Sequence, residues 1–266
     1  MKQLIINADD FGLSDGICRS IHELLDAGAI TSTSLMLCAK DAIRRIKRWN
    51  PSRLLGTAGV HLQLTSGCPL TLSMFTSGQE EDGQFDDPRT RTTFSESELK
   101  KIAKEWKLQI DVACDLLCGL PTHLDSHHGV HRIREIFPIY MQLAMEYGLP
   151  MRGANDGEIK DQIVTNRLPA TVAIVRNWTG RNLCSDKLLE YLKEVEVNNI
   201  DENIVEIVAH PGYSDAYLES VSSLSKARGN DYDVLLHLSK TKSWDMLGYR
   251  LTSYKDYFNG KTFNIS

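Results

Sequence analysis

Short apolar segments alternate with amphipathic segments along this chain of 266 residues, and this alternation constrains the fold more than any other feature. The first apolar segment, residues 4–6, has the length and composition of a buried strand. Ser14 then stands where a helix N-cap is expected, and the apolar residues after it form one helical stripe that ends near Gly28. Strands that alternate with helices predict a largely parallel sheet joined by crossover connections.

The same pattern continues to the end of the chain. Further strands are expected at residues 31–38, 56–64, 123–127, from 151 onward, at 171–175 and at 205–210. Helices are expected at residues 41–49, 95–118, 135–147, 233–238 and 243–247, followed by a last segment at 249–254. About seven or eight strands in an α/β chain of this length predict a distorted (β/α) barrel, with an open doubly wound sheet as the second choice.

We expect residues 1–266 to form a single domain, because no linker rich in Pro, Gly or Ser divides the chain. Two polar stretches interrupt the alternation. Residues 65–94 are too long for an ordinary connection, and we expect either a lid or binding loop, or a disordered surface excursion. Residues 156–169 are polar and indicate no definite element, with a disordered surface excursion as the alternative.

The composition excludes several classes of function. With 42% hydrophobic and 24% charged residues, the chain has the composition of an ordinary globular protein. Its net charge of -5 gives no basic excess for a nucleic acid or a membrane surface. No apolar run reaches the roughly 18 residues of a membrane span, and the first residues do not resemble a signal peptide. We therefore expect a cytoplasmic protein without a nucleic-acid or membrane partner.

Acidic residues and histidines gather at the predicted strand ends, where catalytic residues of parallel α/β folds lie. Asp9 and Asp10 follow the first strand, His61 lies in the third, and His210 ends the last long apolar run. A further group of histidines follows the fourth strand, in the sequence HLDSHHGVH at residues 123–131. Because residues two apart on a strand share a face, His123, Asp125 and His127 should point the same way. This distribution favours a metal site over a polar core network.

The residue types leave the metal open. Two imidazoles and one carboxylate suit hydrolytic zinc, and the same set also serves non-haem iron, whereas magnesium is less natural with two histidines. Two neighbouring carboxylates at one strand end favour hydrolysis. Because adjacent side chains on a strand point in opposite directions, we expect one carboxylate to bind the metal and the other to act as a general base.

The motifs resemble those of the YdjC-like carbohydrate deacetylases, which include the chitooligosaccharide deacetylases. The similarity rests on NADDFG at residues 7–12, TSTS at 31–34, GVHL at 59–62, PTHLDSHH at 121–128, AHPG at 209–212 and GYRLTSY at 248–254. These motifs span nearly the whole chain in the family's order, and residues 65–94 and 156–201 match least. The resemblance implies a distorted (β/α) barrel and metal-dependent removal of acetyl groups from N-acetylated sugars.

Carried over by position, the resemblance implies Asp10, His61 and His127 as ligands of a divalent metal ion, zinc or magnesium. It implies Asp9 as the general base and His210 as the acid that protonates the leaving amine. Arg152 would pair with Asp9 and keep it ionised. One departure is that Gly129 stands where the family often has a third consecutive histidine, which leaves the roles of His128 and His131 open.

The predicted function is hydrolysis of an acetamide in a small acetylated saccharide, which yields acetate and an amino sugar. The resemblance also implies a homo-oligomer, since family members tend to self-associate. Two alternatives remain at this point. One is a metallohydrolase that acts on a different amide or on a phosphoester, which would usually need more Arg or Lys residues around the site. The other is a non-catalytic sugar-binding protein, which would be expected to have lost Asp9 or a metal ligand.

Overall fold

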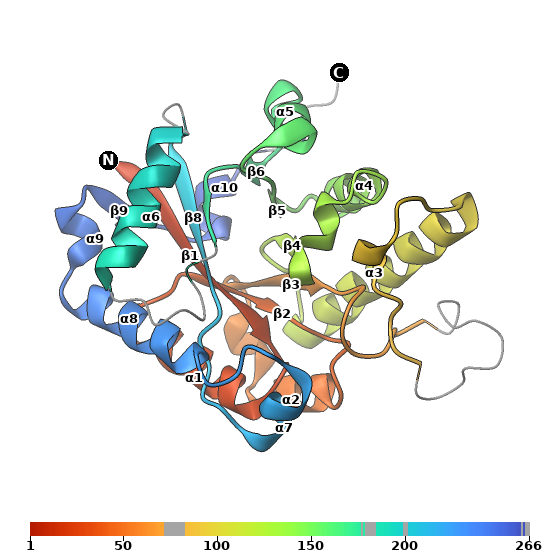
Figure 1. The fold of residues 1–266 in the computed structure, drawn as a ribbon, viewed down its shortest axis with the longest axis horizontal. Helices are drawn as coiled ribbons and strands as arrows, with labels where there is room; N and C mark the ends of the chain where they lie inside the picture. Colours follow the sequence, from red (N-terminus) through yellow and green to blue (C-terminus); the bar gives the residue numbers. More distant parts are fainter. Residues whose placement is uncertain (72–82, 177, 179–184, 199–201, 262, 264–266) are drawn as a thin grey trace.

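The structure is a computed structural model that describes residues 1–71, 83–176, 178, 185–198, 202–261 and 263. Strands and helices alternate along the chain (Figure 1). The strands are β1 (Lys2–Phe11), β2 (Ser32–Leu35), β3 (Ala58–Leu62), β4 (Leu124–Ser126), β5 (Met151–Arg152), β6 (Ala170–Thr171), β7 (Ile174–Val175), β8 (Ile204–Ala209) and β9 (Tyr249–Leu251). The helices are α1 (Asp15–Asp26), α2 (Ala42–Arg48), α3 (Glu96–Leu117), α4 (Phe137–Tyr147), α5 (Gly157–Thr165), α6 (Ser185–Asn198), α7 (Ala216–Val221), α8 (Arg228–Lys240), α9 (Ser243–Met246) and α10 (Tyr254–Phe258). Short 3-10 helices are η1 (Pro51–Leu54), η3 (Pro88–Thr90) and η4 (His127–Arg132).

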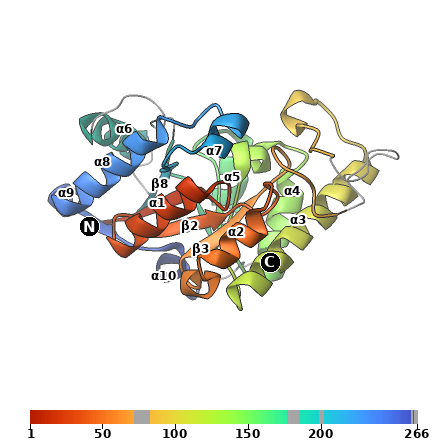
Figure 2. The ribbon, with the colours of Figure 1, turned by 90° about the horizontal axis from the view of Figure 1, so that it is seen from below.

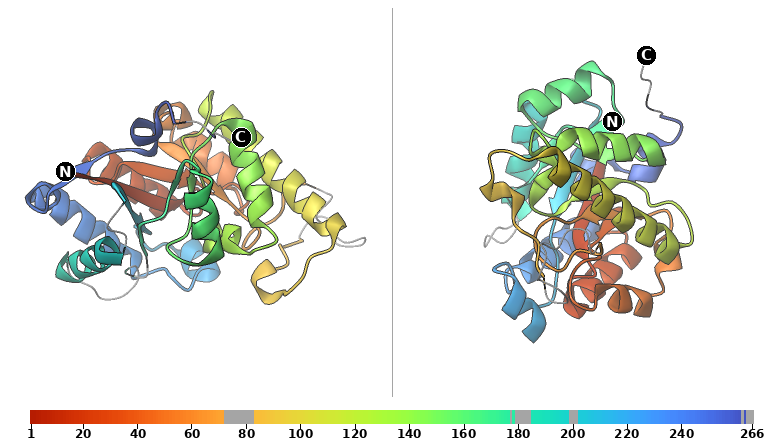
Figure 3. Two further views of the ribbon diagram at one scale, coloured as in Figure 1. Left: turned by 90° about the horizontal axis from the view of Figure 1, so that it is seen from above. Right: turned by 90° about the vertical axis from the view of Figure 1, so that its right-hand side faces the viewer.

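Eight parallel strands form a nearly closed barrel in the order β6-β5-β4-β3-β2-β1-β8-β7. The helices surround the strands, with α1, α2 and α3 along the face that Figure 2 presents, and the two views of Figure 3 show the strands in the middle of the molecule. The predicted distorted (β/α) barrel is therefore confirmed. Strand β9 pairs with the first residues of β1, from Lys2 to Leu4, whereas β2 pairs with β1 from Asn7 onward.

The barrel seam lies between β6 and β7, which occupy the two ends of the strand order. Only Val172 and Ala173 separate these strands in the sequence, so the chain itself crosses the seam. On the inside, Thr171 Oγ1 donates to Glu206 Oε2 at 2.6 Å, which links β6 to β8. The continuous apolar run expected at residues 171–175 is thus two short strands, because one straight strand could not join both edges of the barrel.

Helix starts and apolar stripes explain why the longer helices form where they do. Ser14 caps α1 by accepting from Ile17 N, as expected, and Ser95 with Glu98 forms a capping box at α3. The apolar residues at helical spacing in α3, from Ile102 to Leu117, are buried against the sheet. Caps and apolar stripes that are visible in the sequence therefore account for both helices.

Three predictions about elements were wrong or incomplete. The polar stretch at residues 156–169, for which no element was predicted, contains α5, which buries Ile159 and Ile163. Residues 249–254 contain the strand β9 rather than a continuation of the preceding helices. Helices α6 and α7 were not predicted. None of the described helices is both long enough and apolar enough to cross a membrane.

Candidate active site

A cavity of about 310 Å³ lies at the C-terminal ends of the strands. Its lining includes all six residues that the sequence predicts for the site, namely Asp9, Asp10, His61, His127, Arg152 and His210. They come from β1, β3, η4, β5 and the segment after β8, so barrel closure brings residues about two hundred positions apart into one site. The structure thus brings the predicted site residues together.

Asp9 and Asp10 both face this cavity, although neighbouring side chains on a regular strand point in opposite directions. The reason is an irregularity in β1: its register with β2 shifts between Ala8 and Phe11, and Asp10 has a left-handed backbone with φ 72°. A left-handed conformation is unfavourable for a residue other than glycine and often marks functional positions. The expectation that the two carboxylates must face apart is therefore wrong.

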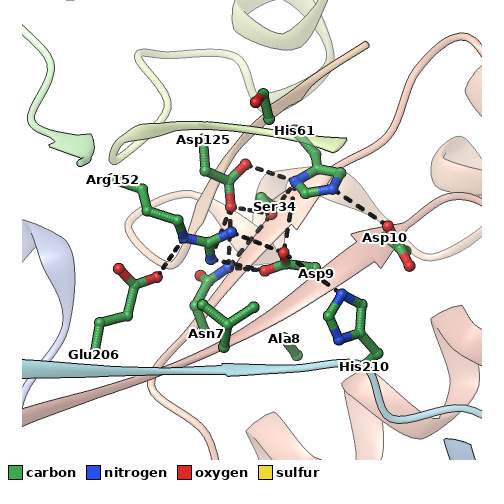
Figure 4. Close-up of polar contacts among 12 residues, drawn as sticks. Asn7, Ala8, Asp9, Asp10, Ser34, His61, Asp125, Arg152, Glu206 and His210 are labelled. Carbon is green, nitrogen blue, oxygen red and sulfur yellow. Dashed lines mark hydrogen bonds and ion pairs between the residues drawn. The ribbon is translucent and has the colours of Figure 1, made fainter. Parts of the chain in front are cut away.

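His61 lies between two carboxylates. Its Nδ1 is 2.7 Å from Asp125 Oδ1, and its Nε2 is 3.3 Å from Asp10 Oδ1 (Figure 4). A carboxylate on Nδ1 fixes the ring and directs Nε2 at a ligand, which is the usual arrangement of a metal-binding histidine. Asp125 therefore orients His61, and the register of β3 with β4 places the two residues opposite each other.

His127 is arranged in the same way. Its Nδ1 is 2.8 Å from Thr65 Oγ1, and its ring centroid lies 5.6 Å from that of His61, in an edge-on orientation. Thr65 is the first residue of the stretch expected to be a lid or binding loop; residues 72–82 of that stretch lie outside the described residues. Because each histidine has its Nδ1 engaged, Nε2 is the atom that remains for a ligand on both rings.

Arg152 binds three buried acids at the centre of the barrel (Figure 4). Its Nη1 and Nη2 donate to Asp9 Oδ2 and Oδ1, both at 2.8 Å, in the pairing expected from the sequence. Nη2 also lies 3.0 Å from Asp125 Oδ2, and Nε donates to Glu206 Oε1 at 2.8 Å. Burial opposes the charge on Arg152, but Asp125, Asp9 and Glu206 outweigh it and raise the arginine pKa well above its usual value.

Sequence reasoning missed several residues of this network. Glu206 is fully buried and also accepts from Tyr254 OH at 2.7 Å. Asn7 Nδ2 donates to Asp9 Oδ1 at 2.8 Å, and Ser34 Oγ donates to Asp125 Oδ2 at 2.9 Å. Glu206 gave a usable signal, since an acid within the apolar run VEIVA must have a partner if that strand is buried.

Helix α8 supplies a further unpredicted residue. Arg228, its first residue, donates from Nη2 to Asp10 Oδ2 at 2.7 Å. Three positions later, Asp231 accepts from the backbone N of His210 at 3.0 Å and holds the segment after β8. His210 Nε2 lies 3.9 Å from Asp9 Oδ2, so these two groups border the same space.

The charged partners decide the protonation of the buried groups. Burial disfavours ionised Asp10, but Arg228 and then His61 outweigh it and hold the pKa of Asp10 well below its usual value. Burial likewise disfavours protonated His61, but Asp125 and Asp9 outweigh it and raise its pKa to about 10. For His127, burial dominates over the attraction of Asp10 and lowers the pKa to about 3. Asp10 and His127 are thus in metal-ligand form, as an ionised carboxylate and a neutral imidazole, whereas His61 is protonated and would have to release its proton when an ion binds.

Two groups of side chains could hold a cation. Asp9, His61 and Asp125 have ligand atoms within 4.8 Å of one another. However, the Arg152 guanidinium contacts both Asp9 and Asp125 within 3.0 Å and would repel a second cation there. Asp10 Oδ1, in contrast, is buried without a well-directed donor among the described residues and faces His61 Nε2. Arg228 also contacts Asp10, but only through Oδ2, whereas Arg152 contacts two carboxylates of the other group, so the residues around Asp10 fit a divalent ion better.

Three other histidines, at positions 123, 128 and 131, lie close to the site. His123 is fully buried and stacks on Tyr254 with ring centroids 3.8 Å apart, away from the cavity. His131 borders the cavity, but its Nδ1 and Nε2 are held by Ser126 Oγ at 2.6 Å and the Gly153 carbonyl at 3.2 Å. His128 also borders the cavity; its ring centroid lies 3.8 Å from that of His127, and its Nδ1 lies 3.1 Å from Thr65 Oγ1.

The fold and the site define a (β/α) barrel with an Asp–His cavity at its catalytic end, and the family model described as "YdjC-like protein" matches residues 3–244. The chain belongs to the YdjC-like family.

Relatives of known name match almost end to end. The chain is 31% identical over 258 residues to the chitooligosaccharide deacetylase of Yersinia enterocolitica, covering 96% of this chain and 99% of that protein. It is 31% identical over 260 residues to the carbohydrate deacetylase of Geobacillus stearothermophilus, covering 97% and 98%. A solved structure from Enterococcus faecalis has a TM-score of 0.80 at 23% identity, covering 96% of this chain and 98% of that one, and shows the same fold.

Proposed function

We propose that this protein is a metal-dependent carbohydrate N-deacetylase, which hydrolyses the acetamide of a small N-acetylated saccharide to acetate and a free amino sugar. The observation that carries the proposal is the pair at the end of β1. Asp9 is held by Arg152, while Asp10 Oδ1, which has no well-directed donor among the described residues, faces His61 Nε2 at 3.3 Å in the same cavity. The names of the relatives supply the substrate class.

Asp10, His61 and His127 are the residues that would hold the metal. Two imidazoles and one carboxylate favour zinc over magnesium, which prefers oxygen ligands. When bound, such an ion lowers the pKa of a water molecule and polarises the acyl oxygen. The network behind the ligands supports this set, since Asp125 and Thr65 orient the two imidazoles.

Asp9 is the proposed general base. Both of its oxygens accept from Arg152, and Asn7 donates to one of them, so its position in the cavity is fixed. A carboxylate that is held in place and ionised can take the proton of the attacking water as the water oxygen bonds to the acyl carbon. Arg152 therefore acts through Asp9 and need not contact the substrate.

His210 is the proposed acid. It borders the same cavity as the ligands, with Nε2 3.9 Å from Asp9 Oδ2. A proton from its imidazole would go to the amide nitrogen as the C–N bond breaks, and the amino sugar would leave. The electron pair of the broken bond stays on nitrogen, while the acyl carbon leaves as acetate, so the reaction is balanced by one water molecule.

The test is acetate release from N,N′-diacetylchitobiose, measured together with the appearance of free amine. The wild-type protein should release both in equal amounts, and a chelator should abolish the activity. Asp9→Asn removes the base but keeps the hydrogen-bonding shape, and we expect a loss of about 10²–10⁴-fold in kcat. Unimpaired turnover by Asp9→Asn, or activity that resists chelation, would reject the mechanism. A phosphatase activity without acetate release would favour the alternative metallohydrolase.

A further inference from the structure

Arg228 holds one oxygen of the proposed metal ligand Asp10. Its side chain is 3% exposed and is fixed at two points: Nη2 donates to Asp10 Oδ2 at 2.7 Å and Nε donates to the carbonyl of Leu224 at 2.7 Å. Its backbone is also fixed, since its carbonyl accepts from Gly212 N at 3.3 Å. Arg228 is therefore a rigid, buried cation beside Asp10.

Because of this contact, the two oxygens of Asp10 have different partners. Oδ2 is occupied by the guanidinium, whereas Oδ1 faces His61 Nε2 at 3.3 Å. A carboxylate with both oxygens available can bind a metal ion through one or through both. With one lone pair of Oδ2 engaged by the guanidinium, binding through both oxygens would bring the ion close to this buried positive charge, so coordination through Oδ1 alone is favoured.

The difference matters for hydrolysis. A catalytic zinc site has three protein ligands and keeps a position for water or substrate, and a second oxygen from Asp10 would compete for that position. A unit positive charge next to the ligand carboxylate also weakens the attraction of the site for a cation. Arg228 would therefore lower metal affinity and at the same time favour turnover.

We propose that Arg228 is a positioning residue that restricts Asp10 to a single coordinating oxygen and so keeps a coordination position open for the reaction. The inference rests on the proposed function, because it takes Asp10 as a metal ligand. This role differs from a structural one. A residue that only held the ligands in place would strengthen metal binding, whereas Arg228 in the proposed role weakens it.

The experiment compares zinc affinity, by isothermal titration of the metal-depleted protein, with kcat and KM for acetate release. For Arg228→Met we expect zinc to bind about tenfold more tightly or better, since a positive charge is lost and a second oxygen is gained. We expect kcat to fall by about ten- to a hundredfold, with KM changed less than about threefold. Arg228→Lys keeps a charge and a donor and should stay close to the wild type in zinc affinity. If Arg228→Met does not fold, Arg228→Gln removes the same charge and should also bind zinc more tightly.

Arg45→Met is the matched control. Arg45 is similarly buried and donates to the Gly12 carbonyl, but it touches none of the proposed ligands, so its loss should lower stability without changing zinc affinity. Weaker zinc binding by Arg228→Met, or an unchanged kcat, would overturn the inference. Asp10→Asn tests the function separately: if it binds zinc as tightly as the wild type, the ligand set fails and the inference fails with it.

Discussion

Replacing Arg152 by methionine should destabilise the barrel more than any single substitution on its surface. Arg152 contacts Asp9, Asp125 and Glu206 at 2.8–3.0 Å, and the exposed fractions of these side chains are 5% or less. Removing one partner of a buried ion pair costs about 3–5 kcal/mol, because the other charge stays buried without compensation. Because three acids are affected, we expect the free energy of unfolding to fall by about 4–5 kcal/mol, near the top of this range.

A double-mutant cycle separates this cause from the loss of packing. Glu206→Gln neutralises one of the acids and leaves the contacts from Thr171 and Tyr254 possible. The double variant Arg152→Met with Glu206→Gln should therefore lose about 1–3 kcal/mol less than the sum of the single variants. The free energy of unfolding would be measured at pH 7 by urea denaturation, followed by both tryptophan fluorescence and circular dichroism.

The pH dependence of the free energy of unfolding tests whether the loss of stability comes from the unpaired acids. Burial raises the pKa of Asp125, but Arg152 and then His61 outweigh it, so this pKa is lowered in the wild type. Its stabilisation is present above the unfolded value of about 3.9 and is lost as the pH falls below it. Without Arg152, the largest attraction that opposes burial is lost and this pKa should rise, so the difference in stability between variant and wild type should narrow as the pH falls through the variant's pKa. A loss below about 1 kcal/mol at pH 7, or an additive cycle, would refute the reasoning.

Three further predictions concern the ligands and the core. In zinc titrations, His127→Gln should lower zinc affinity by about a hundredfold or more, and Asp125→Asn by about 10–100-fold. The reverse order would favour Asp9, His61 and Asp125 as the metal ligands. Burial lowers the pKa of His131 to about 3, so the unfolded chain takes up a proton below about pH 6.5 that the folded chain does not. The wild type should therefore lose about 2 kcal/mol more than His131→Gln between pH 7 and 5, and equal losses in urea titrations would contradict this. A Cβ on Gly59 would lie 2.4 Å from His123 Cε1 and 2.6 Å from its carbonyl oxygen, so Gly59→Ala should lower stability by about 1–3 kcal/mol, seen as a lower urea midpoint.

The barrel could be predicted because strand-forming runs such as β1 and β8 are long and apolar, and their ends carry the histidines and acids. Local pattern also located α3, whose cap and stripe are both visible in the sequence. It failed at β6 and β7, where the strands are two residues each and their separation depends on closure of the barrel.

The network behind the site was only partly predictable. Asp10 adopts a left-handed backbone that no local signal announces, and this brings it to the same side as Asp9. Arg228 meets Asp10 across 218 positions of sequence, and it lies in a polar stretch without periodicity. Such contacts depend on how distant elements dock, whereas the ligands themselves lie at strand ends, where topology alone brings them together.

The most direct test of the metal-dependent deacetylase is a zinc titration of the metal-depleted protein, followed by acetate release from N,N′-diacetylchitobiose. Activity should be absent without metal and rise in proportion to added zinc until one ion is bound per chain, and Asp10→Asn should not recover at the same zinc concentrations. Full activity before any zinc is added, or recovery of Asp10→Asn along the wild-type curve, would contradict the account.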